Sequence, residues 1–281
     1  MLKRCIAVFV PDGLDSGDQG GYEALDRVSG RGCSGLLAWR RGESLSVPGE
    51  VEQLAQVLGC STSAQLDGFE LRREYQGAKC RLITSSEAAH AALGSAFDRS
   101  ELIDATSATS SSRAWCEAVD RSLTESLSDG PDFVLAHLVF GGAQGGGKQR
   151  VLNDLVHLIL KNHVDDSTLL VVLAGDDGET RIENGFGRAR GDEDDAGKEG
   201  LPRFLPRQSF QYSGGELIDD LCDKARVLCV HYSPVNHVRR DAVETFSASE
   251  ALSRGGNGVT LATHLLKGIM FSVSRAPKYG A

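Results

Sequence analysis

The sequence predicts an α/β fold with three layers, in which helices cover both faces of a mainly parallel sheet. Apolar runs of strand length alternate with stretches of helical spacing along the whole chain, as in repeated strand–helix–strand units. The strand runs are continuously apolar, which is typical of parallel strands buried on both faces. Glycine is frequent, 33 of 281 residues, and suits the many tight turns that such a fold needs.

The amino-terminal part of the chain contains three strand-then-helix units. We expect strands at 4–10, 34–39 and 79–86, and helices at 22–32, 48–59 and 87–97. The first strand is closed by the turn sequence PDG. The second helix has Glu50 and Glu52 in its first turn and Gly59 at its end, which are typical start and stop signals. Ser85 or Ser86 is the expected cap of the third helix.

The rest of the chain continues the alternation. We expect strands at 132–140, 167–177 and 226–233, and helices at 114–127, 149–164, 216–225 and 257–273. Residues 188–200 read RARGDEDDAGKEG, and we expect a flexible, exposed acidic loop there. No linker composition divides the sequence. We therefore predict a single domain over residues 1–281.

The net charge and the cysteine content of the chain argue against some classes of function. The formal net charge of −9 argues against a nucleic-acid surface and against binding to an anionic membrane. The seven cysteines form no CxxC pair, which indicates reduced thiols. No apolar run approaches the ~20 residues of a membrane span, and the first strand begins almost at Met1 without a signal peptide. We expect a cytoplasmic protein, with the nucleus as the alternative.

The stretch FGGAQGGGKQR suggests a phosphate-binding loop. Gly142, Gly147 and Lys148 match the spacing G-x-x-x-x-G-K, in which backbone N–H groups surround a phosphate and the lysine reaches its terminal oxygens. The next residue should be Ser or Thr, to bind Mg²⁺, but it is Gln149. Asp176 could supply the second carboxylate of such a site. The interpretation that we favour is a permissive surface loop, and the nucleotide loop is the alternative.

Several blocks resemble, in order, cofactor-independent phosphoglycerate mutases of the archaeal type, which belong to the alkaline-phosphatase superfamily. AVFVPDGLDSGD resembles their first strand and DG turn, and ALDRVSGRGCSGLL resembles the helix and strand that follow. DFVLAHLVFGGAQGGGKQRVLNDLVHLI resembles a block with an aspartate and a Gly-His pair between a strand and a helix, and TLLVVLAGDDGET resembles the strand that ends in Asp-His-Gly. ETFSASEALSRGGNGVTLATHLL resembles the closing segment. The resemblance implies an alkaline-phosphatase-like core without the inserted domain of the mutases.

The resemblance also implies a site. The family uses two divalent metals, held by Asp and His, and a Ser or Thr nucleophile that attacks phosphorus between them. Asp12 matches the first metal aspartate, and Asp176 matches the aspartate of the Asp-His pair. Asp177 stands where the histidine should be, so it changes the charge and softness of that ligand. This interpretation requires Asp12 and Asp176 to lie close together in the fold.

Other positions depart from the family pattern. Gly141 or Gly142, and Gly146, occupy the region of the Asp and Gly-His ligands, and residues 178–230 contain no histidine. The nucleophile should follow a glycine at a helix entry, but that entry reads SVPGEVEQL, with Gly49-Glu50 and no serine after the glycine. Ser46 is near but outside the pattern. The glycine loop therefore resembles a metal loop that has lost its ligands.

We predict a non-catalytic, phosphomutase- or phosphatase-like protein that acts as a binding or regulatory subunit without a cofactor. A protein partner or a small phosphoester would be its ligand. The first alternative is a metal-dependent phosphatase or phosphomutase, with Mn²⁺, Mg²⁺ or Zn²⁺ held by Asp12, Asp176 and Asp177. The second is a nucleotide binder that uses Gly142, Gly147 and Lys148.

Some polar residues have simpler interpretations. Asp12, Asp15 and Asp18 could hold a cation together, but turn-forming aspartates are the favoured interpretation. His137 lies in an apolar strand and is interpreted as a hydrogen-bonded core histidine. His231 and His237 flank a proline turn, where histidines are commonly exposed. Cys33 and Cys229 are expected to be buried small hydrophobic residues.

Overall fold

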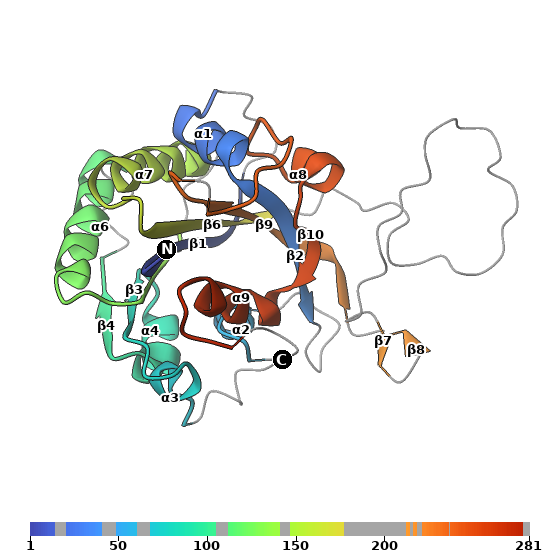
Figure 1. The fold of residues 1–281 in the computed structure, drawn as a ribbon. Helices are drawn as coiled ribbons and strands as arrows, with labels where there is room; N and C mark the ends of the chain where they lie inside the picture. The colour runs from blue at the N-terminus through green and yellow to red at the C-terminus, as the bar shows by residue number, and fades with distance from the viewer. Residues whose placement is uncertain are drawn as a thin grey trace, which may run out of the picture.

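The chain folds around one large sheet with helices on both of its faces (Figure 1). The computed structural model describes residues 1–14, 21–40, 49–60, 68–104, 112–140, 147–176, 212–213, 216–217, 221–235 and 237–277. Within these residues, eight strands form the sheet in the order β10-β2-β9-β6-β1-β5-β3-β4. The predicted α/β architecture with three layers is confirmed. The predicted acidic loop at 188–200 lies outside the described residues.

Seven of the eight strands run in one direction and one runs against them. The strands of the sheet are β1 (Arg4–Leu14), β2 (Cys33–Arg40), β3 (Cys80–Thr84), β4 (Arg99–Leu102), β5 (Phe133–His137), β6 (Thr168–Asp176), β9 (Leu221–Tyr232) and β10 (Gly258–Leu261). Strand β9 pairs antiparallel with both β2 and β6, and all other pairs are parallel. Two short strands, β7 (Tyr212–Ser213) and β8 (Glu216–Leu217), form a separate hairpin. The prediction of a mainly parallel sheet is confirmed.

The helices form two layers that bury opposite faces of the sheet. They are α1 (Glu23–Arg31), α2 (Glu50–Val57), α3 (Leu71–Glu74), α4 (Glu87–Leu93), α6 (Ser112–Leu127), α7 (Lys148–Asn162), α8 (Ala248–Arg254) and α9 (Leu265–Ser272), with short 3₁₀ turns at η2 (Gly94–Ala96) and η4 (Ala262–His264). In Figure 1, α1, α6, α7 and α8 lie on one side of the sheet, and α2, α3, α4 and α9 lie on the other.

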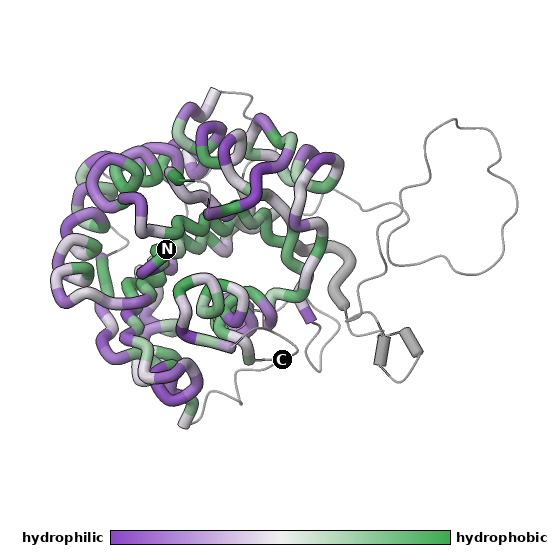
Figure 2. The backbone as a smooth tube through the Cα atoms, in the orientation of Figure 1, coloured by the Kyte–Doolittle hydropathy of each residue, from purple (hydrophilic) through white to green (hydrophobic). Residues whose placement is uncertain are grey.

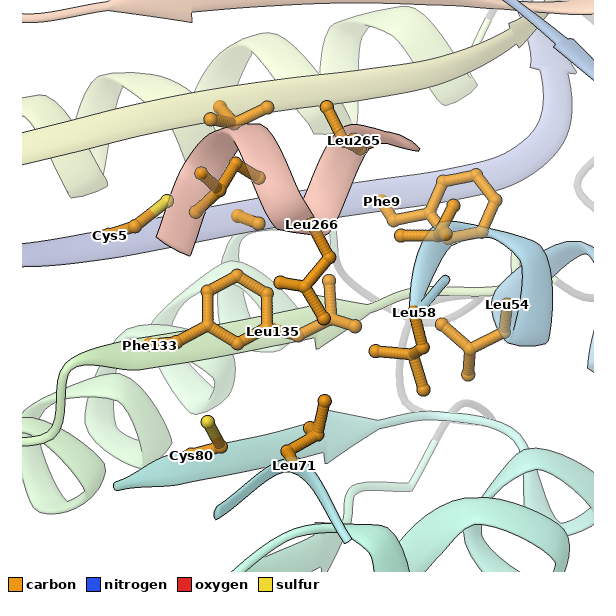
Figure 3. Packing of buried hydrophobic residues seen from close by; sticks show 14 of the residues in the cluster. Cys5, Phe9, Leu54, Leu58, Leu71, Cys80, Phe133, Leu135, Leu265 and Leu266 are labelled. Carbon is orange, nitrogen blue, oxygen red and sulfur yellow. The ribbon is translucent and has the colours of Figure 1, made fainter. Parts of the chain in front are cut away.

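The alternating side chains of each central strand divide between two cores. Phe9 and Leu135 pack with Leu54, Leu58 and Leu266 under α2 and α9 (Figure 3). The alternate residues of the same strands pack under α1, α6 and α7. Figure 2 shows the apolar residues along the central strands and the polar residues on the outer helices. Burying one such leucine or phenylalanine stabilises the fold by about 1.5–3 kcal/mol, so the continuous apolar runs have a clear physical cause.

Two predicted helices are wrong in whole or in part. Residues 216–225 were predicted as a helix, but they contain β8 and the beginning of β9. Strand β9 bonds to β2 on one edge and to β6 on the other, and this pairing with distant segments outweighs local helix propensity. The predicted helix at 257–273 begins with strand β10, which pairs with the edge of β2 and buries Val259 and Leu261.

Smaller differences concern the ends of elements. Strand β1 does not stop before the PDG sequence; it continues to Leu14, and its register with β6 shifts between Val10 and Leu14. Such a bulge accommodates a proline and a glycine in a strand. The predicted helix at 87–97 ends as an α-helix at Leu93, and the sequence analysis did not predict β4. Ser86 caps α4, since its hydroxyl oxygen accepts from the Ala89 N–H at 3.0 Å.

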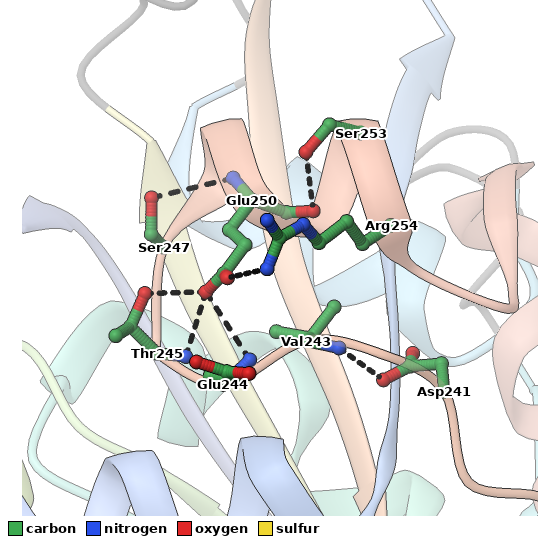
Figure 4. Close-up of polar contacts among 8 residues, drawn as sticks. All are labelled: Asp241, Val243, Glu244, Thr245, Ser247, Glu250, Ser253 and Arg254. Carbon is green, nitrogen blue, oxygen red and sulfur yellow. Dashed lines mark hydrogen bonds and ion pairs between the residues drawn. The ribbon is translucent and has the colours of Figure 1, made fainter.

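The turn before α8, in the segment between β9 and β10, is fixed by hydrogen bonds to the Glu250 carboxylate. Glu250, in the first turn of α8, accepts hydrogen bonds from the backbone N–H groups of Glu244 and Thr245, at 3.2 and 2.7 Å, and from the Thr245 hydroxyl at 2.5 Å (Figure 4). Its other oxygen pairs with Arg254 at 3.2 Å. Ser247 caps the same helix. These hydrogen bonds fix the conformation of the segment before α8. It is part of the sequence block that resembles the family's closing segment.

Candidate functional site at the carboxyl edge of the sheet

The two predicted metal aspartates lie on neighbouring strands. Asp12 is in the last part of β1 and Asp176 is the last residue of β6. These strands are parallel and paired, and Leu14 stands opposite Asp176 in the register. Neighbouring strands are about 4.8 Å apart. The backbone therefore brings both aspartates to the same edge of the sheet, as the metal interpretation requires. Asp177, Asp15 and Asp18 lie outside the described residues.

The helix entry that replaces the expected nucleophile is acidic. Gly49, in an extended conformation, precedes Glu50, the first residue of α2. The Glu52 carboxylate accepts from the Gly49 N–H at 3.1 Å. Glu50 Oε1 is buried and has no hydrogen-bond partner among the described residues. In Figure 3, Leu54 lies farther than Leu58 along the direction in which the strands point, so α2 begins on the carboxyl side of the sheet.

The glycine-rich stretch connects a strand to a helix. Strand β5 ends at His137, and α7 begins at Lys148 with Gly147 before it. This strand–loop–helix order is the context that a phosphate loop needs. Gly141, Gly142 and Gly146 lie outside the described residues, so the role of Gly142, Gly147 and Lys148 stays a prediction. Gln149, where a magnesium-binding hydroxyl would stand, is buried at 9% exposure.

The last residue of β5 is a buried histidine with one bonded nitrogen. His137 Nδ1 lies 3.0 Å from the Thr84 hydroxyl, and its ring centroid is 5.5 Å from that of Phe9. Nε2 is buried and has no hydrogen-bond partner among the described residues. Burial lowers the pKa of His137 to about 3, so the ring is neutral at neutral pH. The predicted burial is confirmed, but the expected full hydrogen bonding is not. No sequence pattern indicates the unpaired nitrogen, because the residues around it come from distant strands.

Other predicted residues lie away from this edge. His231 lies near the end of β9, opposite Cys33 at the start of β2. His237 is exposed, with Nε2 3.3 Å from the nitrogen of Met1. Both histidines therefore lie at the amino edge of the sheet. Cys33 and Cys229 are buried, as predicted.

No metal centre is formed by the side chains that the structure describes. A search of those residues for three or more His, Cys, Asp or Glu side chains that could hold one ion finds none. The set Asp12, Asp176 and Asp177 thus remains a prediction that rests on backbone placement. None of the helices in the described ranges has the length and apolar character to cross a membrane.

Comparison with known proteins shows the fold. No family model matches the chain, and no curated protein sequence matches it. The structure of the PH0037 protein from Pyrococcus horikoshii has a TM-score of 0.59 and 10% identity, covering 100% of both chains. Cofactor-independent phosphoglycerate mutase from Thermoplasma acidophilum has a TM-score of 0.51 and 10% identity, over 97% of this chain and 100% of the other.

A third similar structure is murine ectonucleotide pyrophosphatase/phosphodiesterase 5, solved as an inactive form with AMP. Its TM-score is 0.52 and its identity 9%, over 100% of this chain and 98% of the other. Together these matches confirm that the chain has the alkaline-phosphatase-like fold that its sequence resembles. At such identities the likeness concerns the fold, and the residues of this chain have to decide its chemistry.

Proposed function

We propose that this protein is a pseudoenzyme, in which an alkaline-phosphatase-like fold binds a partner or a small phosphoester without transferring its phosphoryl group. The observation that carries the proposal is the acidic entry of α2. Glu50 stands where the resemblance implies a hydroxyl nucleophile. A carboxylate has no hydroxyl oxygen to attack phosphorus in the way that a serine does.

The charges in the first turn of α2 also argue against phosphoryl transfer. The first turn of a helix attracts anions, because its N–H groups are unpaired and its dipole is positive there. Here Glu50 and Glu52 occupy that turn, and Glu52 already accepts the Gly49 N–H. A phosphoryl group placed for attack at this turn would meet two negative charges, which disfavours phosphoryl transfer here; a phosphoester ligand would have to bind away from this turn.

Metal analysis and a phosphatase assay test the proposal. Purified protein should hold less than one equivalent of Mn²⁺ or Zn²⁺ and should not hydrolyse an aryl phosphate in added Mn²⁺ above the rate of Asp12→Asn. Asp166→Asn is the matched control, since Asp166 is an exposed carboxylate outside the candidate site. Turnover that the Asp12 and Asp176 variants lose and the Asp166 variant keeps would refute the pseudoenzyme.

That refuting outcome would establish the second candidate, a metal-dependent phosphatase or phosphomutase. The neighbouring positions of Asp12 and Asp176 favour it, because two carboxylates at adjacent strand ends can share a hard divalent cation. Asp177 would be the third ligand. The metal would then stabilise charge on the phosphoryl oxygens, and the protein would have to supply an attacking group other than a serine after Gly49.

A further inference from the structure

A groove lies at the amino edge of the sheet, at the opposite end of the strands from the candidate site. Its volume is about 1220 Å³, somewhat above the roughly 300–1,000 Å³ of common ligand pockets. It runs between α9 and the strands β10, β2, β9 and β6. The lining residues Cys33, Leu169 and Asn257 lie at the beginnings of β2 and β6 and just before β10, and His231 lies near the end of antiparallel β9.

One wall of the groove is apolar. Leu37, Leu169 and Cys229 lie on the sheet side, and Leu265 and Phe271 line the groove from α9. Phe271 is 47% exposed, although large apolar side chains in the described part of the chain are mostly buried. Covering this ring would remove apolar area from water at about 25 cal/mol per Å². The wall therefore favours an apolar ligand group.

The other end of the groove is polar and cationic. Arg239 is exposed and forms no ion pair with a described residue. His231 lines the groove as well. Burial lowers the pKa of His231 to about 4, so its neutral ring can donate one N–H at neutral pH. This end offers the positive charge of Arg239 and one neutral donor, and Lys267 of α9 is a second cation in the lining of the groove.

The neighbouring charges limit the charge of a ligand. The Asp241 carboxylate lies close to this end but accepts the backbone N–H groups of Ser34, Val243 and Gly256. Glu74 lines another part of the groove. The lining thus carries two cations, Arg239 and Lys267, against Glu74, and Asp241 lies close by. With two carboxylates so placed, a monoanion is favoured over a dianion. A carboxylate also matches the two parallel N–H donors of a guanidinium.

We propose that this groove binds an amphipathic carboxylate, with an aliphatic chain along Phe271 and Leu265 and the carboxylate at Arg239 and His231. The site is independent of the proposed pseudoenzyme, because it involves none of Asp12, Glu50 and Asp176. It lies at the other edge of the sheet. Its ligand class follows from the exposed guanidinium of Arg239, one neutral donor, an apolar wall and the carboxylates that offset the second cation, Lys267.

Isothermal titration calorimetry with decanoate, below its micelle concentration, tests this assignment. We expect decanoate to bind one site per chain, decanol to bind at least tenfold more weakly, and decylamine not to bind. Decyl phosphate at a pH where it is a dianion should bind more weakly than decanoate. No decanoate binding, or tighter binding of decyl phosphate or decylamine, would overturn the assignment.

Variants locate the binding. Arg239→Gln should weaken decanoate binding about tenfold, the value of one charge-assisted hydrogen bond, and Phe271→Ser should weaken it as well. Arg240→Gln is the matched control, because Arg240 is an exposed neighbour that does not line the groove. Equal affinity in the Arg239 and Arg240 variants would place the ligand elsewhere and refute the proposal. Sedimentation that showed a dimer unable to bind decanoate would assign the groove to a second copy of the chain instead.

Discussion

The carboxylates at the two edges of the sheet differ in their hydrogen bonding. At the amino edge, Asp132 accepts the Lys79 N–H at 2.8 Å and pairs with Arg275 at 2.8 Å, and Asp241 accepts three backbone N–H groups. At the carboxyl edge, Glu50 Oε1 and His137 Nε2 are buried without partners among the described residues. Unpaired buried polar atoms are costly. The hydroxyls of Ser34 and Ser233, at the amino edge, are also buried without partners among the described residues. The contrast therefore concerns the carboxylates: those of the amino edge join separate segments of the fold, whereas Glu50 Oε1 joins none of those that the structure describes.

The largest effect should come from the amino edge. Asp241→Ala would leave the N–H groups of Ser34, Val243 and Gly256 without their acceptor, and these groups join β2 to the turn before β10. We expect a loss of about 3 kcal/mol in the free energy of unfolding, measured by urea denaturation. Asp241→Asn, which keeps one acceptor oxygen, should lose less. A loss below about 1 kcal/mol in Asp241→Ala would contradict a structural role for this edge.

A smaller effect is expected at Glu250. Its hydrogen bond with the Thr245 hydroxyl, with further help from the Thr245 and Glu244 N–H groups and Arg254, lowers the pKa of Glu250. A lowered pKa means that this carboxylate stabilises the fold above its unfolded pKa of about 4.3 and that the contribution is lost as the pH falls through the folded pKa. Glu250→Gln should therefore cost about 1 kcal/mol at pH 7 and less below about pH 4.

Thermal unfolding at several pH values measures this difference. Glu244→Gln is the matched control, since it removes a charge from the same segment (Figure 4) and leaves the carboxylate of Glu250 in place. A Glu250→Gln difference that did not shrink in acid would show that packing, and not the charge, stabilises the segment.

The smallest change in stability is expected at the carboxyl edge. Glu50→Ala removes a buried, unpaired carboxylate oxygen, which should nearly offset the roughly 0.3–1 kcal/mol that an acidic residue contributes at a helix start. We expect a change below about 1 kcal/mol in either direction by urea denaturation. A loss as large as that of Asp241→Ala would show that Glu50 is a structural residue and would remove the contrast between the edges.

The sequence predicted the features that depend on local pattern. The continuous apolar runs predicted the central strands. The pairing of β1 with β6 puts the backbones of Asp12 and Asp176 at one edge of the sheet, and their role as metal ligands stays a prediction. The sequence-based prediction was wrong where the secondary structure depends on pairing with distant segments. Residues 216–225 were predicted as a helix but contain β8 and the beginning of β9. The groove was not predicted, because Phe271, His231 and Arg239 share no sequence pattern. The unpaired nitrogen of His137 depends likewise on side chains far away in the chain.

The antiparallel direction of β9 allows the length of the stretch 177–220 to vary. Strand β6 ends at Asp176, opposite Arg226, and β9 begins at Leu221, opposite Arg40 of β2. The stretch 177–220 therefore leaves the sheet and rejoins it at the same edge. A connection of that kind is a hairpin, whose two anchor points stay fixed whatever its length, and lengthening it costs only slowly rising entropy. Insertions and deletions can therefore accumulate there without disturbing strand register. Any recognition sequence acquired in that stretch would be tethered beside Asp176.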